Sequence, residues 1–239
     1  MSSAAPAGVV LLHGLMGTAA SHFGQQMGAW RKDRRVYPVD LPGHGTCGAD
    51  APPAYYRRVT EWFCRALEKI GPAHVVGASY LGGTIGLLAA RRRPDLVRSL
   101  VVSGYTAEVP PAAFAAWSAG FRLLADGNPQ MQAAYRQLHG PRWSATLDAV
   151  TEDCRTSYET EIALRWSDIE ALPLPVLLAN GDFKENEREA ARRYARPVGA
   201  LRGRIVEEAG HLPMVDRPAA FAAAVEQFWS EHQEERVQG

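Results

Sequence analysis

The chain has few cysteines, and their placement excludes two classes of protein. Cys47, Cys64 and Cys154 are odd in number and far apart in the sequence. This spacing argues against a disulfide framework and against a metal-binding knuckle, and it fits a reducing compartment. We therefore expect a cytoplasmic protein, and our hypothesis for its function includes neither a metal ion nor an organic cofactor.

The chain also lacks an excess of charge and a long apolar run. Lys plus Arg and Asp plus Glu each number 26, so nothing favours electrostatic binding of nucleic acid or of an anionic membrane. No apolar run approaches the roughly 20 residues that span a bilayer. Residues 1–6 have neither the basic segment nor the apolar segment of a signal peptide. The expected partner is a small-molecule substrate, with no nucleic acid and no membrane, and the sequence leaves the oligomeric state open.

Short apolar runs alternate with helical patterns along most of the chain. The 239 residues, 46% hydrophobic and 22% charged, suit one domain with a sizeable core. Strands are expected over 9–12, 36–40, 75–76, 100–104, 176–181 and 203–206, and helices over 56–70, 84–93 and 219–229. Strands that alternate with helices predict an α/β fold with a mostly parallel sheet flanked by helices.

The segment 105–172 interrupts this alternation. It is helical in pattern and rich in large apolar side chains, so we expect a helical lid inserted into a core formed by 1–104 and 173–239. Trp117, Phe121, Trp143 and Tyr105 are the candidates for the lining of an apolar substrate pocket. The alternative is that these aromatic side chains fill a small core within the insertion itself.

The run from Gly77 to Gly83 lies between a predicted strand and a predicted helix, which is the context of a nucleophile elbow. Such a turn needs small residues near its tip. Ala78 and Gly82 flank Tyr80 at two positions on either side, whereas Leu81 stands two positions after Ser79. Sterics therefore favour Tyr80 at the tip. Ser79 remains the alternative, because the sequence on its strand side is the usual one.

Four motifs, each at a predicted strand end, resemble one superfamily. They are His13-Gly14, the run from Asp40 to Gly45, the elbow itself, and Ala209-Gly210-His211. With these motifs in this order the chain resembles the α/β-hydrolase fold over nearly its whole length, and its compact cytosolic members in particular.

The resemblance implies a catalytic constellation of nucleophile, acid and histidine in chain order. His211 matches the general base. The usual position of the acid is occupied by Lys184, so Asp182 is the first candidate, Glu185 the second and Glu108 a remoter one.

The resemblance also implies an oxyanion hole made of two backbone N–H groups. They would be those of Leu15 and of the residue after the tip, which is Leu81 if Tyr80 is the tip. His13 and His44 are expected to be structural.

An atypical triad with Tyr80 in place of serine predicts non-hydrolytic acid–base chemistry on a small apolar carbonyl compound. Cyclisation, elimination or isomerisation, of the kind used in natural-product biosynthesis, would suit it. One alternative is a serine hydrolase of an ester, a thioester or a C–C bond that uses Ser79 and His211. Another is a ligand-binding protein on a catalytically dead scaffold.

Overall fold

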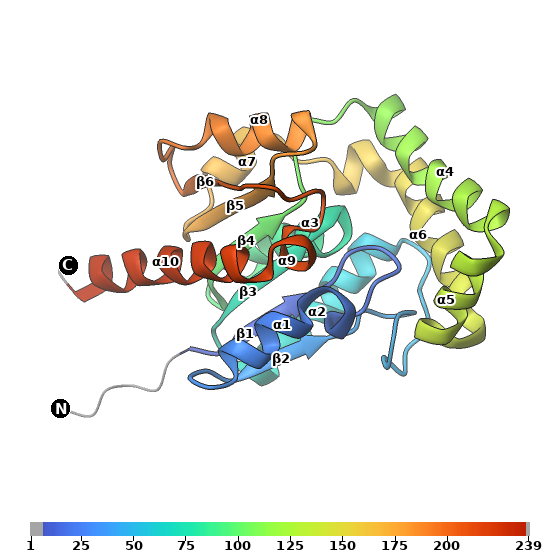
Figure 1. Ribbon diagram of the computed structural model, residues 1–239, viewed down its shortest axis with the longest axis horizontal. Coiled ribbons are helices and arrows are strands. Elements are labelled where there is room, and N and C mark those ends of the chain that lie inside the picture. Colours follow the sequence, from blue (N-terminus) through green and yellow to red (C-terminus); the bar gives the residue numbers. More distant parts are fainter. Residues whose placement is uncertain (1–6, 238–239) are drawn as a thin grey trace.

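The computed structural model describes residues 7–237, with side chains up to residue 232. Its centre is one parallel sheet in the order β2-β1-β3-β4-β5-β6 (Figure 1). The strands are β1 Val9–Leu12, β2 Val36–Val39, β3 Ala73–Ala78, β4 Val97–Ser103, β5 Val176–Gly181 and β6 Leu201–Val206. The predicted α/β architecture with a parallel sheet is thus confirmed. The residues 1–6, on which the expectation of no signal peptide rests, lie outside the described part.

Helices cover both faces of the sheet, which explains why the central strands are apolar on both sides. The covering helices are α1 Ala19–Trp30, α2 Tyr55–Ile70, α3 Ser79–Arg92, α8 Glu185–Arg193, α9 Pro213–Asp216 and α10 Pro218–Val237. One face packs Val76 and Val101 against Phe23 of α1 and Phe221 of α10. The other face packs against α2, α3 and α8. In residues 7–237 no helix combines the length and the hydropathy that crossing a bilayer requires.

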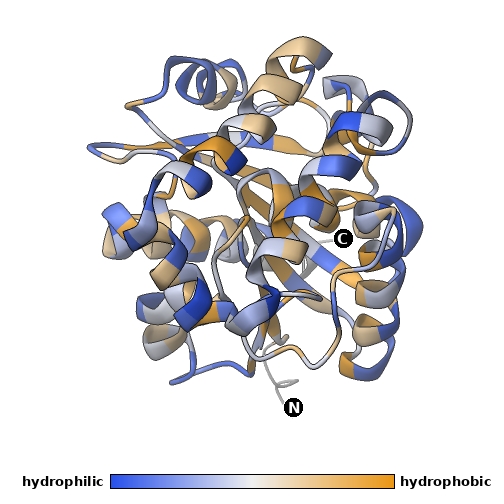
Figure 2. Ribbon diagram, turned by 90° about the vertical axis from the view of Figure 1, so that its right-hand side faces the viewer, coloured by the Kyte–Doolittle hydropathy of each residue, from blue (hydrophilic) through white to orange (hydrophobic). Residues whose placement is uncertain are grey.

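The helical insertion lies between β4 and β5, and most of it extends to the right of the sheet in Figure 1, while its last helix lies at the upper left beside α8. It contains α4 Pro111–Gly127, α5 Pro129–His139, α6 Trp143–Ser157 and α7 Trp166–Glu170, with a 3₁₀ turn at Gly140–Arg142 and a π-helical turn at Tyr158–Ile162. In Figure 2, which views the molecule from this side, apolar segments of the sheet lie behind helices of mixed hydropathy. The insertion is therefore placed beside the sheet, where it can form one wall of a site.

Candidate active site

Ser79 stands at the tip of the turn that joins β3 to α3. Its φ of +59° lies in the left-handed region that non-glycine residues rarely adopt. Ser79 is also the first residue of α3, which follows β3 without an intervening loop. The prediction that Tyr80 occupies the tip is therefore wrong, and the alternative with Ser79 is the arrangement found.

The close contacts around the turn explain why the steric prediction failed. A Cβ on Gly82 would lie 2.3 Å from the Leu12 carbonyl oxygen of β1, and a Cβ on Gly77 would lie 2.5 Å from the Gly82 carbonyl oxygen. The position that must be small is thus three residues after the tip. Leu81, two residues after it, is 1% exposed and packs into the core. Its bulk imposes no constraint on Ser79.

His211 lies opposite Ser79, in the loop between β6 and α9. Its Nε2 is 2.7 Å from Ser79 Oγ. Gly104, which follows β4 with φ +65°, lies against this histidine, and a Cβ there would be 2.2 Å from the His211 carbonyl oxygen and 3.1 Å from its ring. The end of β4 therefore fixes where the imidazole can sit. The expectation that His211 faces the tip of the turn is met by this geometry.

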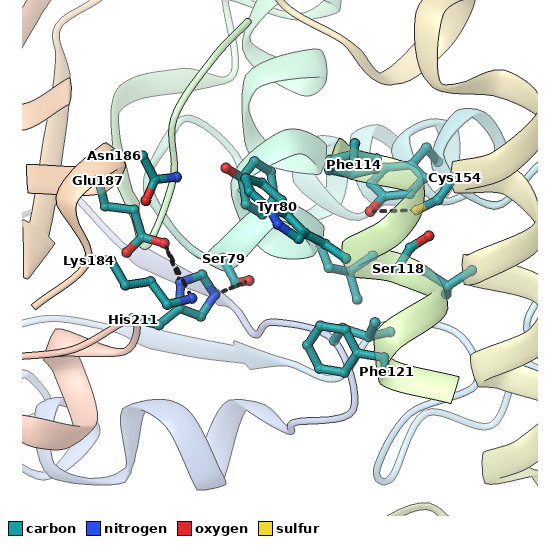
Figure 3. A pocket seen from close by; sticks show the side chains of 15 residues that line it. Ser79, Tyr80, Phe114, Ser118, Phe121, Cys154, Lys184, Asn186, Glu187 and His211 are labelled. Carbon is teal, nitrogen blue, oxygen red and sulfur yellow. Dashed lines mark hydrogen bonds and ion pairs between the residues drawn. The ribbon is translucent and has the colours of Figure 1, made fainter. Parts of the chain in front are cut away.

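The second imidazole nitrogen contacts a carboxylate that the sequence reasoning missed. His211 Nδ1 is 2.7 Å from Glu187 Oε1, and the Glu187 side chain is 2% exposed (Figure 3). Glu187 is the third residue of α8, and a helix N-terminus favours negative charge. Asn180 at the end of β5 donates through Nδ2 to the carbonyls of Glu187 and Tyr105, each at 2.8 Å. This amide links α8 to the chain beyond β4.

The carboxylates proposed from the sequence have other contacts. Asp182 Oδ1 accepts a hydrogen bond from the Ala209 N–H at 3.1 Å, which holds the loop before His211. Glu185 is exposed, and Glu108 accepts from the Trp166 N–H at 3.3 Å. None of these three carboxylates has a contact with His211, so the prediction of Asp182 as the partner of His211 is wrong.

Lys184 occupies the usual position of the acid, but it does not prevent a carboxylate from reaching His211. Its Nζ lies 3.8 Å from Glu187 Oε1, the oxygen that also faces His211. The lysine therefore does not displace the acid. The carboxylate reaches the histidine from the first turn of α8, three residues beyond the usual position and outside the loop in which the acid was expected. The sequence signal for this acid was a glutamate three residues after Lys184, in a segment with a helical pattern.

The two contacts of His211 define the proton positions. A carboxylate accepts, so Nδ1–H donates to Glu187, which leaves Nε2 to accept the Ser79 hydroxyl proton. This is the arrangement of a serine nucleophile, its general base and an orienting acid. Figure 3 shows the three side chains in line, with the imidazole in the middle.

Two backbone N–H groups near Ser79 in the chain fold are candidates for an oxyanion hole. The turn after β1 lies against it, because a Cβ on Gly14 would be 2.9 Å from Ser79 Cβ. The Gly14 N–H itself donates to His22 Nδ1 at 3.1 Å, so the next N–H, that of Leu15, is the one available beside the nucleophile. With Ser79 at the tip, the second donor is the N–H of Tyr80 at the start of α3 and not that of Leu81, which corrects the prediction.

A cavity of about 350 Å³ opens from Ser79 toward the insertion. Besides the triad residues, its lining consists of Leu15, Tyr56, Tyr80, Leu81, Phe114, Trp117, Ser118, Phe121, Val150, Cys154, Lys184 and Asn186. Trp117 and Phe121 line it, as their pattern suggested. Trp143 and Tyr105 do not: Trp143 packs in the core of the insertion, and Tyr105 borders a separate small cavity behind Tyr80.

Tyr80 forms part of the cavity wall. Its ring packs against Tyr105, Phe114 and Trp117 at centroid distances of 5.1, 5.3 and 5.9 Å. Its buried hydroxyl has no hydrogen-bond partner among the described residues. Burial raises the pKa of this phenol well above its usual value. A phenol so placed is poorly suited to exchange protons near neutral pH.

The cavity is mostly apolar, and its charged side chains, Lys184 and Glu187, lie at the triad end, whereas Tyr56, Ser118 and Cys154 add polar atoms on the other side. Across residues 7–237, no group of three or more His, Cys, Asp and Glu side chains could hold a metal ion. The chemistry that such a site can offer is nucleophilic attack by a serine on a carbonyl carbon, with the N–H groups of Leu15 and Tyr80 as candidate donors to the developing oxyanion.

The chain is similar to known proteins in sequence and in structure. The alpha/beta hydrolase family matches residues 9–224. NosK from Streptomyces actuosus is 45% identical, with a TM-score of 0.91 over 94% of this chain and 98% of that one. A pimeloyl-[acyl-carrier protein] methyl ester esterase of Neisseria meningitidis is 28% identical over 218 residues, which are 81% of each chain. The 2-hydroxy-6-oxo-6-phenylhexa-2,4-dienoate hydrolase of Rhodococcus sp. strain RHA1 is 17% identical with a TM-score of 0.73, covering 94% of this chain and 90% of that one, and shares the fold. The family match over residues 9–224, together with the sheet order and the motifs at the strand ends, shows that the chain belongs to the alpha/beta hydrolase family.

Proposed function

We propose that this protein is a serine hydrolase that cleaves a carboxylic ester or thioester with an apolar acyl group. The observation that carries the proposal is the pair of 2.7 Å contacts joining Ser79 Oγ to His211 Nε2 and His211 Nδ1 to Glu187 Oε1. The esterase among the relatives belongs to the same reaction class.

The first half of the reaction forms an acyl-enzyme. Ser79 Oγ attacks the carbonyl carbon while His211 Nε2 takes the hydroxyl proton, and the carbonyl oxygen becomes an oxyanion facing the N–H groups of Leu15 and Tyr80. Each preorganised donor of this kind contributes about 3 kcal/mol to the transition state. The tetrahedral intermediate collapses, and His211 returns its proton to the departing alkoxide or thiolate.

The second half uses the same groups on water. His211 removes a proton from a water molecule that attacks the acyl carbon, and it then protonates Ser79 as the carboxylic acid leaves. Glu187 orients the imidazole and stabilises the imidazolium that forms in each half of the reaction, without taking its proton. Its burial leaves little water to compete for Nδ1–H.

The shape of the cavity supports an apolar acyl group. Phe114, Trp117 and Phe121 of α4, with Val150 of α6, give one wall without a charged group. The acyl chain would lie along this wall, and the leaving group would face the polar end with Lys184 and Asn186 (Figure 3).

This proposal replaces the interpretation in which Tyr80 performs non-hydrolytic acid–base chemistry. The phenol does not stand at the tip, its hydroxyl makes no hydrogen bond with His211, and its pKa is raised. An inactive scaffold is disfavoured too, because all three triad groups are within hydrogen-bonding distance of their partners.

A fluorophosphonate probe tests the proposal without knowledge of the natural substrate. The wild-type protein should be labelled stoichiometrically, and Ser79→Ala should not be labelled at all. The matched variant Tyr80→Phe should be labelled at a rate close to that of the wild type. Labelling that persists in Ser79→Ala, or that disappears in Tyr80→Phe, would reject the assignment of the nucleophile.

A further inference from the structure

The turn that provides the Leu15 N–H is held in an unfavourable conformation. The Gly17 N–H donates to the Gly14 carbonyl at 3.1 Å, which makes Leu15 and Met16 the central residues of a tight turn. Met16 has a φ of +54°, at a position where turns of this kind favour glycine. Such a conformation persists only where surrounding contacts enforce it.

The first of these contacts is apolar and comes from the helical insertion. The Met16 side chain is 3% exposed and packs in a small core with Ala125 of α4 and with Trp143 and Leu147 of α6. These three residues follow Met16 by more than a hundred positions in the chain. The side chain of the strained residue is therefore anchored in a different part of the chain.

The second contact is polar and comes from the last residue of α5. His139 Nε2 is 3.0 Å from the Met16 carbonyl oxygen, and its Nδ1 accepts the Gly45 N–H at 2.9 Å. Because Nδ1 must accept, the proton lies on Nε2 and is donated to Met16. Burial lowers the pKa of His139, which agrees with a neutral ring of fixed tautomer.

We propose that His139 and the Met16 anchor are positioning residues, through which the helical insertion holds the Leu15 N–H in the oxyanion hole. This inference rests on the proposed function. The helical insertion then has a second function besides covering the cavity. Its two contacts hold Met16 at the carbonyl and at the side chain. The end of the insertion formed by α5 and α6 then has to stay in place during the reaction.

The test compares two ketones in which CF3 replaces CH3, a change that strongly favours addition of a serine to the carbonyl carbon. 1,1,1-Trifluoro-4-phenyl-2-butanone forms a tetrahedral adduct with an active serine, whereas 4-phenyl-2-butanone occupies a pocket as a ketone. Affinities of both are measured for wild type, for His139→Phe, which keeps a planar ring but removes both nitrogens, and for His139→Gln. The control is Thr146→Val, which removes a different buried hydrogen bond between the insertion and the core, from Thr146 Oγ1 to the Gly43 carbonyl.

We expect His139→Phe to bind the trifluoroketone about 10- to 100-fold more weakly, as displaced catalytic groups commonly cause. Its affinity for the methyl ketone should change less than about threefold, and His139→Gln should recover part of the loss. Thr146→Val should lose stability without changing the ratio of the two affinities. Equal weakening of both ligands, or an unchanged ratio in folded His139→Phe, would overturn the inference.

Two further measurements keep the result decisive. If His139→Phe does not fold, Met16→Ala removes the apolar anchor and should show the same selective loss, and an unchanged ratio there is contradictory. If the wild type shows no preference for the trifluoroketone, the proposed function fails by itself. In that case the NMR resonance of the Leu15 backbone amide reports whether the N–H has moved. It should shift in His139→Phe and stay unchanged in Thr146→Val, and the absence of a shift in His139→Phe would reject the inference.

Discussion

The two walls of the cavity are built by opposite means. The wall formed by the strand ends holds Ser79, His211 and Glu187 through short hydrogen bonds and through glycines that allow close approach. The facing wall from α4 and α6 is apolar, and Trp117 and Phe121 on it are 43% and 39% exposed. Under the proposed function, the first wall carries out the reaction and the second selects which acyl groups fit.

Glu187→Gln should have the largest effect on the strand-end wall. The amide cannot serve as an ionised partner for the imidazolium and can present an N–H to Nδ1, so kcat should fall by about 10³- to 10⁴-fold. The control is Glu185→Gln, an exposed carboxylate on the same helix, which should leave steady-state kinetics of a p-nitrophenyl ester unchanged. Equal losses of kcat in both variants would contradict the assignment of Glu187 as the acid that orients His211.

Gly104→Ala should come next, with a loss of about 100-fold in kcat. The added Cβ would lie 2.2 Å from the His211 carbonyl oxygen, so the histidine has to move away from Ser79. Gly71→Ala is the matched control, because Gly71 also has a positive φ, +85°, but no atom within 4 Å of the added Cβ. Both variants should lose stability in urea unfolding, and activity should fall in Gly104→Ala alone.

Mild acid should weaken the strand-end wall through His13, which is buried, and His22, which is partly buried. Burial lowers the pKa of His13 and of His22 to about 4. The unfolded chain binds these protons near pH 6.5 and the folded chain does not, so stability falls as the pH drops from 6.5 toward 4 and is constant above 6.5. At pH 5 each histidine should lower the free energy of unfolding by about 2 kcal/mol. Urea unfolding at pH 7 and pH 5 measures this loss, and His22→Gln should reduce it. An equal loss in the variant would contradict the assignment to His22.

Trp117→Ala should have a smaller effect that depends on the acyl chain. Removing the ring takes away apolar contact from the insertion wall, so KM for p-nitrophenyl octanoate should rise about tenfold while kcat stays the same. The acetate ester, which is too short to reach the ring, should show little change. A comparable loss of kcat on the acetate ester would mean that this wall also takes part in the chemistry.

Tyr80→Phe should have the smallest effect. This variant tests whether the Tyr80 hydroxyl takes part in the reaction or the ring only lines the cavity. The phenolic hydroxyl has no partner among the described residues and the ring keeps its packing without it. We expect kcat/KM to stay within about threefold of wild type. A loss of 100-fold or more would restore the tyrosine to the chemistry.

The sequence carried most of the information about the fold and part of that about the site. The strand-end motifs and the alternation of apolar runs predicted the parallel sheet, because each depends on local patterning. His211 was identified from its motif for the same reason. Trp117 and Phe121 were found as cavity residues because the insertion is rich in aromatic side chains.

The remaining features depend on contacts between distant segments. Whether Ser79 or Tyr80 forms the tip is decided by the approach of Gly82 to the Leu12 carbonyl of β1, which no local pattern encodes. Glu187 reaches His211 because α8 begins soon after the end of β5 and Glu187 lies in its first turn. Asn180 fixes the start of α8 by donating to the backbone carbonyls of Glu187 and Tyr105. The role of Trp143 in the core of the insertion likewise appears only when α4 and α6 are packed together with Met16.

The most direct measurement is the location of the acyl group during turnover. The protein would be mixed with a p-nitrophenyl ester, quenched in acid within the first turnover, digested, and the elbow peptide fragmented by mass spectrometry. Our account predicts the acyl mass on Ser79, and its accumulation should be lost in Ser79→Ala. An acyl group on Tyr80, or turnover that continues in Ser79→Ala with no acylated peptide, would contradict it.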